Sequence, residues 1–153
     1  MRLVLDTNVV VSGLLWDGKP ARLIDAASAG DVELSTSRTL LAELTRILRR
    51  AKFDKAVAAA ELSIEDLVLR YAELVTVVQP ASITPTIIAD PDDDHVLACA
   101  LAAKVDAIVS GDPHLLNLAR YQRISIIAPA EAVRLIAPRS GFGSIKTDSQ
   151  GGV

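Results

Sequence analysis

Short apolar runs alternate along the chain with longer stretches in which apolar residues recur every three or four positions. The short runs predict buried β-strands at residues 3–5, 32–35, 75–78, 107–109 and 124–127. The longer stretches predict α-helices at residues 8–15, 21–29, 37–50, 63–74, 93–104 and 113–120, a short helix from 54 and a last helix from 129. Strands that alternate with helices indicate an α/β sandwich around a parallel sheet.

Polar residues and prolines mark the ends of these elements. Ser37 is a suitable N-cap for the helix that follows it, and residues 63–66 resemble a capping box. Residues 80–93 contain three prolines and are predicted to form a loop. The last residues are polar and rich in glycine, without periodicity. We therefore expect one domain over residues 1–137 and a flexible C-terminal tail over 138–153.

The composition fits a domain with an aliphatic core. Half of the 153 residues are hydrophobic but only 3% are aromatic, which suits helices packed on a buried parallel sheet. No stretch approaches the roughly 20 apolar residues that cross a bilayer, and the N-terminus does not read as a signal peptide. The single cysteine, Cys99, cannot form an internal disulfide, which fits a reducing cytosol. We expect a soluble, cytoplasmic protein.

The net charge of −3 argues against a nonspecific nucleic-acid coat, because such proteins carry a basic field. It does not argue against an enzyme that acts on nucleic acid. Carboxylates that hold a metal ion lower the formal charge, and the bound cation still attracts phosphate. With so few aromatic residues, base stacking is not expected to be the main source of affinity. The only tryptophan, Trp16, is expected to be buried in a dimer contact rather than to stack on a base.

Two aspartates directly follow predicted strands. Asp6 follows the first strand, and Asp112 follows the fourth in a Ser-Gly-Asp turn. In open parallel sheets, ligand sites form beyond the carboxyl ends of the strands, where the strand order reverses. Either residue alone could equally be a turn or N-cap aspartate.

Two further acids lie in predicted helices. At about 100° per residue, Asp94 shares a face with Leu97, Ala98 and Leu101, whereas the two aspartates before it do not and suit a solvated capping run. Glu43 lies at the border of an apolar helical stripe. Taken alone, Glu43 fits an ordinary boundary glutamate paired with the arginines at 46 and 50.

Together these four acids indicate a metal site. Carboxylates within a few ångströms of one another repel, so some must bind protons unless a cation lies among them. Hard oxygen ligands select Mg²⁺ or Mn²⁺. With one cysteine and two histidines, a thiolate or imidazole zinc site is improbable. An acidic magnesium site at strand ends points to phosphoryl transfer.

The sequence resembles the PIN-domain family, and within it the bacterial toxin-like branch related to VapC ribonucleases. Four blocks carry the resemblance: Leu-Asp-Thr-Asn at 5–8, Leu-Ala-Glu-Leu at 41–44, the acidic stretch at 90–100, and Val-Ser-Gly-Asp at 109–112 followed by leucines at 115 and 116. In this order they span residues 1 to about 137.

The resemblance implies a three-layer, Rossmann-like α/β/α sandwich with a central parallel sheet of about five strands, in which the first and fourth strands are neighbours. It maps the family's acidic quartet onto Asp6, Glu43, Asp94 and Asp112, as catalytic residues and as ligands of Mg²⁺ or Mn²⁺. Supporting positions are Thr7, Asn8, Asp92, Asp93 and Ser110, the last standing where relatives often have threonine. It also implies a homodimer, and a small antitoxin protein as partner.

The implied function is a metal-dependent endoribonuclease, the toxin of a toxin–antitoxin pair. The metal-activated water would hydrolyse an RNA phosphodiester and leave a 5′-phosphate and a 3′-hydroxyl. Arg46 and Arg50, at the basic end of the Glu43 helix, either contact RNA phosphates or simply form a solvated helix end.

Three alternatives remain open at this stage. A phosphoacceptor receiver domain also gathers aspartates at strand ends, but it needs a lysine after the last strand, where this chain has Ala128 and Pro129. A non-catalytic module with a PIN fold would keep the architecture without the activity. A nuclease for DNA flaps usually carries extra helices, for which 153 residues leave little room.

Overall fold

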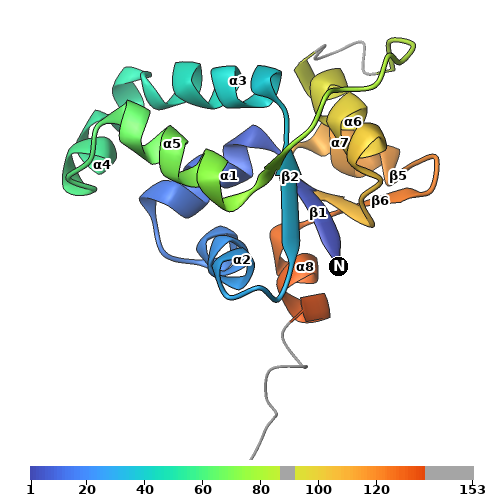
Figure 1. Ribbon diagram of the computed structural model, residues 1–153, viewed down its shortest axis with the longest axis horizontal. Coiled ribbons are helices and arrows are strands. Elements are labelled where there is room, and N and C mark those ends of the chain that lie inside the picture. The colour runs from blue at the N-terminus through green and yellow to red at the C-terminus, as the bar shows by residue number, and fades with distance from the viewer. Residues whose placement is uncertain (87–91, 137–153) are drawn as a thin grey trace, which may run out of the picture.

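Strands and helices alternate along most of the chain in the computed structural model, which describes residues 1–86 and 92–136 (Figure 1). The strands are β1 (Arg2–Leu5), β2 (Glu33–Thr36), β3 (Thr76–Val77), β4 (Ala107–Val109), β5 (Arg120–Tyr121) and β6 (Ile124–Ile127). The helices are α1 (Thr7–Leu15), α2 (Lys19–Ser28), α3 (Arg38–Leu48), α4 (Asp54–Ala59), α5 (Ile64–Leu74), α6 (Asp92–Ala103), α7 (Pro113–Leu118) and α8 (Pro129–Ile136), and a 3₁₀ turn, η1 (Ala51–Phe53), precedes α4.

The strands form one sheet in the order β3-β2-β1-β4-β6-β5. All neighbouring strands are parallel except β5, which is antiparallel to β6. The first strand, β1, therefore lies in the middle, with β2 on one side and β4 on the other. This is the reversal of strand order at which parallel sheets form ligand sites, and it brings the residues that follow β1 and β4 together.

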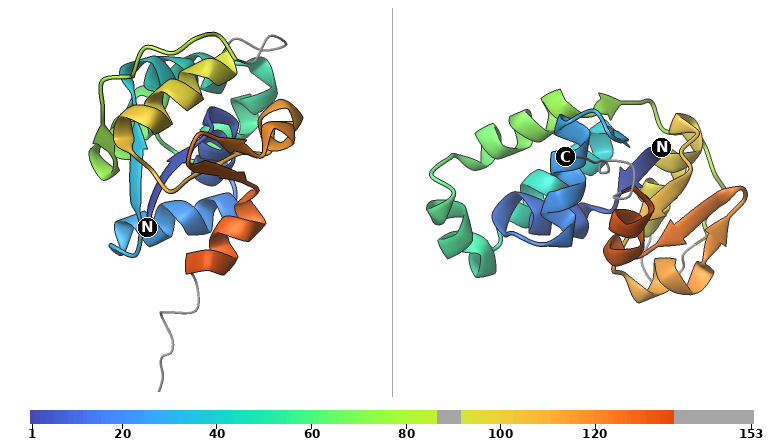
Figure 2. Two further views of the ribbon diagram at one scale, coloured as in Figure 1. Left: turned by 90° about the vertical axis from the view of Figure 1, so that its right-hand side faces the viewer. Right: turned by 90° about the horizontal axis from the view of Figure 1, so that it is seen from below.

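The sheet separates two apolar cores, because successive side chains of a strand point to opposite faces. Leu3 and Leu5 of β1 belong to one core, which includes buried residues of α1, α2, α3, α5 and α8. Val4 belongs to the other, which is formed largely by α6 and α7. Figure 2 shows helices on both sides of the strands. The predicted three-layer α/β/α sandwich with an aliphatic core is therefore confirmed.

Most predicted element boundaries agree with the structure to within two residues, and the predicted serine caps are present. The Ser37 Oγ accepts a hydrogen bond from the backbone N–H of Leu40 at 3.2 Å, and the Ser63 Oγ accepts one from Asp66 at 3.0 Å. Each cap satisfies a backbone donor that the first turn of the helix leaves without a partner.

The five predicted strands are present and parallel to one another, and the sheet has one further short strand, β5, that the pattern does not predict. The helix predicted to reach residue 120 ends at Leu118, and Arg120 and Tyr121 form β5 instead. Ala119 and Gln122, on either side, have positive φ angles of 65° and 53°, which turn the chain back along β6. Two residues are too few to show the alternation that marks a strand. The proposed domain boundary and the tail over 138–153 lie outside the described residues, as do residues 87–91 of the predicted loop.

None of the helices in the described part of the chain combines the length and the apolar content that a membrane-crossing helix needs.

The Tyr71 hydroxyl is buried in the first core, and the described residues offer its oxygen no hydrogen-bond partner. Burial of a hydroxyl without a partner costs about 1–3 kcal/mol. Replacement by phenylalanine keeps the ring and removes this cost, so we expect Tyr71→Phe to raise the free energy of unfolding in urea by at least about 1 kcal/mol. A loss of more than 1 kcal/mol would mean that the hydroxyl has a partner, such as a buried water molecule.

Candidate metal centre

Asp6 lies where β1 passes into α1, and its backbone serves both elements. Its N–H donates to the Val109 carbonyl at 2.9 Å, which continues the pairing of β1 with β4. Its carbonyl accepts from the N–H groups of Val9 and Val10 in the first turn of α1. Asp6 is only 6% exposed, and its carboxylate makes no capping hydrogen bond to α1. The N-cap alternative therefore does not explain the side chain.

The Ser110 hydroxyl links Asp6 to Asp112. Ser110 is fully buried, and its Oγ donates to the Asp6 Oδ2 at 2.8 Å while accepting from the backbone N–H of Asp112 at 2.9 Å. Asp112 itself caps α7, since its Oδ1 accepts from the His114 N–H at 2.8 Å. The capping interpretation of Asp112 is therefore confirmed, but the same carboxylate also faces Asp6.

Three carboxylates converge at the carboxyl ends of β1 and β4. Asp6, Asp93 and Asp112 each contribute an oxygen, and these oxygens lie within 4.8 Å of one another. Asp93 comes from the first turn of α6 and is 4% exposed. The N-terminal end of a helix favours negative charge, so an acidic residue suits this position.

The predicted position of Asp94 needs a correction. Its carboxylate oxygens accept from the backbone N–H of Thr86 at 3.1 and 3.2 Å, outside the group formed by the other three acids. The pattern of apolar residues predicts the helical phase one residue too late. Asp93 shares the deeply buried face of α6 with Val96, Leu97 and Ala100, whereas Leu101 is only partly buried.

Glu43 lies beside this group and is linked to it by a hydrogen bond from Thr7, the residue after Asp6. The buried Thr7 hydroxyl donates to the Glu43 Oε1 at 2.8 Å and so joins α1 to the middle of α3. The charge of Glu43 is close enough to raise the pKa of Asp6. Glu43 is therefore part of the acidic site but not of the tight group of three.

The other predicted supporting residues differ in their distance from the cluster. Arg46 Nη2 lies 3.7 Å from Glu43 Oε2 and 3.8 Å from Asp92 Oδ2, so it bridges α3 and α6 at the rim of the acids. The expected pairing of Glu43 with an arginine is thus found for Arg46. Asn8 is exposed and lines a hollow together with Asp112. Arg50 is exposed beyond the end of α3.

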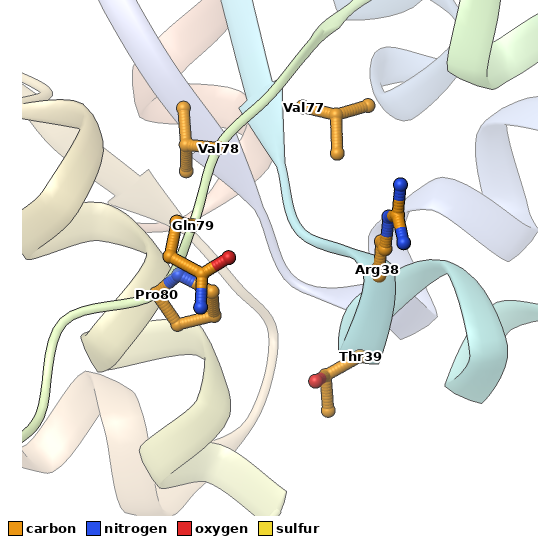
Figure 3. Close-up of a pocket in the computed structure, with 6 residues that line it drawn as sticks. All are labelled: Arg38, Thr39, Val77, Val78, Gln79 and Pro80. Carbon is orange, nitrogen blue, oxygen red and sulfur yellow. The ribbon is translucent and has the colours of Figure 1, made fainter.

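A groove lies between α3, the segment after β3, and α6. One part of it is lined by Arg38, Thr39, Val77, Val78, Gln79 and Pro80, and Figure 3 shows the two α3 residues facing Gln79 and Pro80 across the opening. An adjoining part shares Thr39 and Pro80 and extends to Asp94 and His95. The groove therefore reaches the outer side chains of the α6 N-terminus, while the three converging acids lie outside its lining.

The electrostatics of the cluster favour a bound cation. The pKa of Asp6 is raised to about 6, above all by burial and also by the charges of Asp112 and Glu43, against the opposing hydrogen bonds from Ser110 and the Thr7 backbone. Ligands of one Mg²⁺ ion lie about 3.0 to 4.2 Å apart, so three oxygens that lie within 4.8 Å of one another could share one ion after small shifts. The all-carboxylate donor set thus fits Mg²⁺ or Mn²⁺.

The raised pKa of Asp6 has a consequence for stability without metal. The ordinary pKa is 3.8, so the folded protein binds this proton more tightly than the unfolded chain does. Protonation of Asp6 therefore stabilises the folded state. This stabilisation is complete below about pH 4 and is lost as the pH rises through about 6, and its loss lowers the free energy of unfolding by about 3 kcal/mol. In EDTA, we expect Asp6→Asn to melt several degrees above the unmodified protein at pH 7, and this difference to shrink towards pH 4. A difference that is constant with pH would contradict this.

Comparisons with known proteins identify the family. No curated protein matches the chain in sequence. Among solved structures, the fold is similar to a chain in the crystal structure of FitAcB from Neisseria gonorrhoeae, with 19% sequence identity, 84% of this chain and 98% of that chain covered, and a TM-score of 0.45. The PIN-domain family model matches residues 2–114, a range that includes Asp6, Glu43, Asp93 and Asp112. This match leaves the receiver-domain alternative without support, and the chain belongs to the PIN-domain family.

Proposed function

We propose that this protein is a Mg²⁺- or Mn²⁺-dependent endoribonuclease that hydrolyses RNA phosphodiesters. The observation that carries the proposal is the convergence of Asp6, Asp93 and Asp112 within 4.8 Å at the ends of the two central strands. PIN domains are generally nucleases, which supports this class of reaction.

Asp6, Asp93 and Asp112 would hold the cation, directly or through water. When bound, the cation lowers the pKa of a water molecule and offsets negative charge at the phosphorus in the transition state. The Ser110 hydroxyl would orient the Asp6 carboxylate by donating to its Oδ2. The same hydroxyl fixes the backbone that carries Asp112.

Glu43 is the residue best placed to receive a proton from the attacking water. Thr7 holds its Oε1, and Arg46 lies near its Oε2, so the carboxylate has a fixed direction at the rim of the cluster. The water oxygen would bond to phosphorus, the bond from phosphorus to the 3′ oxygen would break, and that oxygen would take up a proton. The products would be a 5′-phosphate and a 3′-hydroxyl.

The remaining site residues have supporting roles in this proposal. Arg46 and Arg50 would contact RNA phosphates, and Asn8 would orient a ligand or water beside Asp112. Asp92 would position Arg46 through their ion pair. The Asp94 carboxylate, which accepts the Thr86 N–H, would hold Thr86 rather than the metal.

We further propose the biological setting that the VapC resemblance implies. The protein would act in the cytoplasm as a homodimeric toxin, and a small antitoxin protein would keep it inactive. The buried, unpaired thiol of Cys99 is compatible with a reducing compartment.

The decisive experiment is incubation of the purified protein with total RNA. We expect cleavage in Mg²⁺ or Mn²⁺, loss of cleavage in EDTA, and recovery when the metal is added back in excess. Asp6→Asn, prepared in the same way, controls for contaminating nucleases and is expected to be inactive while remaining folded by circular dichroism. We expect the new 5′ ends to carry a phosphate, which makes them substrates for RNA ligation.

A non-catalytic PIN-fold module is the competing function, and the same experiment separates the two. Such a module would bind without cleaving, in any metal. Cleavage that persists in Asp6→Asn or in EDTA would equally contradict the proposed site.

A further inference from the structure

Trp16, Phe53 and Lys52 form a cluster away from the acids, which we refer to as the aromatic platform. The ring centroids of Trp16 and Phe53 lie 6.0 Å apart with an interplanar angle of 55°. The Lys52 Nζ lies 5.1 Å from the centroid of the Phe53 ring, within the range of a cation–π contact. Trp16 is nevertheless 50% exposed, although it is the largest apolar side chain in the protein.

The platform and the acidic cluster lie at opposite ends of α1. At one end, Thr7 at the start of α1 contacts Glu43 in α3. At the other, Trp16 at the end of α1 contacts Phe53, just beyond α3. The partners are offset by 36 residues at the first contact and 37 at the second, so α1 and the chain from Glu43 to Phe53 run side by side in the same direction. Along the nine residues of α1 this distance is about 14 Å, a span of a few nucleotides.

The chain between these two ends is basic. Residues 44–53 contain four cations, Arg46, Arg49, Arg50 and Lys52, and no acid. Arg46 is paired at the acidic rim and Arg49 with Glu65, but neither Arg50 nor Lys52 forms an ion pair with any acid in the described part of the chain. An exposed aromatic ring, here Trp16, beside cations that form no ion pair is a feature with which proteins bind single-stranded nucleic acid: a base stacks on the ring and phosphates lie near the cations.

We propose that the aromatic platform binds a base of the single-stranded RNA substrate a few nucleotides from the cleavage site, with the strand following the line from Glu43 past Arg50 to Trp16. This inference rests on the proposed ribonuclease function and adds a substrate-binding subsite to it. A second copy of the chain is the less suitable occupant. In a two-fold symmetric contact the same patch meets itself, which would bring Arg50 and Lys52 near their counterparts.

The platform supplies its own probe, since Trp16 is the only tryptophan. The test titrates unmodified protein with a single-stranded oligoadenylate in EDTA, so that no cleavage occurs. We expect saturable quenching of tryptophan fluorescence, at the same concentrations at which the anisotropy of a labelled oligonucleotide rises. Anisotropy without quenching would overturn the proposal, because the RNA would then bind elsewhere. No binding in either measurement would overturn it as well.

Variants separate the contribution of base stacking from the effect of removing any exposed apolar side chain. Trp16→Ala is expected to weaken oligonucleotide binding about tenfold, and Trp16→Phe to recover most of the affinity. Leu69→Ala, which removes an equally exposed apolar side chain from α5, should leave the affinity unchanged. Arg50→Gln should reduce the slope of log affinity against log salt concentration by about 0.7. Thermal melting of each variant verifies folding.

The same variants distinguish this inference from the proposed function. With Mn²⁺ present, Trp16→Ala should raise KM about tenfold and leave kcat nearly unchanged, because the platform does not touch the reacting atoms. Normal cleavage with unchanged KM in Trp16→Ala would overturn the platform and leave the nuclease function intact. If sedimentation shows that Trp16→Ala turns a dimer into a monomer with unaltered RNA affinity, the platform is a contact between copies and the proposal is wrong.

Discussion

Asp93→Asn is expected to reduce RNA cleavage at least about 100-fold, because even residues that merely support metal ligands typically contribute 10- to 100-fold. Asparagine keeps the size of the side chain but removes one of the three charges that hold the cation. The structure places the Asp93 carboxylate in the buried group with Asp6 and Asp112. Initial rates on a defined RNA in saturating Mn²⁺ would measure the loss.

The neighbouring Asp94→Asn variant is a closely matched control. It makes the same chemical change, one residue further along the first turn of α6, so it alters the helix dipole and the net charge in the same way. Its amide oxygen can still accept the Thr86 N–H, and we expect cleavage near the rate of the unmodified protein. If instead Asp94→Asn is inactive and Asp93→Asn is active, the helical phase predicted from the sequence is correct and the arrangement described for α6 is not.

Divalent metal is expected to stabilise the protein strongly at pH 7. An ion that binds only the folded state at 100 times its Kd adds about 2.7 kcal/mol to the free energy of unfolding. In this site the ion also offsets repulsion among the three carboxylates. Differential scanning fluorimetry in EDTA, and then with increasing Mn²⁺, should therefore show a progressive rise in Tm for the unmodified protein and for Asp94→Asn. Asp6→Asn and Asp93→Asn should show little rise.

This stabilisation is expected to weaken in acid. Because the pKa of Asp6 is raised to about 6, only about one molecule in ten has this carboxylate ionised at pH 5. Metal and proton compete for it, so the apparent Kd for Mn²⁺ should be about ten times higher at pH 5 than at pH 7. Isothermal titration calorimetry in two buffers of different ionisation enthalpy would also detect proton release on binding. An equal Kd at both pH values would exclude Asp6 from the ligands.

The sequence predicted the layers of the fold because the chain alternates apolar runs with amphipathic helices throughout. The resemblance to the PIN-domain family, in which the first and fourth strands are neighbours, also predicted that Asp6 and Asp112 lie side by side. Which residues of α6 face the core was harder to predict. Buried positions surround most of that helix, so Leu97 and Ala98 do not distinguish the face that carries Asp93 from the face that carries Asp94.

Contacts between distant side chains were not predictable from the sequence. No local pattern indicates that Thr7 binds Glu43, or that the Ser110 hydroxyl joins Asp6 to the backbone of Asp112. The strand β5 was missed because its pairing depends on two residues with positive φ, and neither Ala119 nor Gln122 is a residue type that marks such a position. The exposure of Trp16 likewise depends on how η1 packs against the end of α1.

The backbone hydrogen bond from Asp6 to Val109 ties the Asp6 backbone to the middle of the sheet. The backbones at Asp6 and Val109 can move apart only if the two middle strands separate, which would require global unfolding rather than a loop movement. Any protein that silences this centre therefore has little prospect of distorting it. Such an inhibitor must instead block the site, either by covering the opening above the three carboxylates or by inserting a cationic side chain of its own among them.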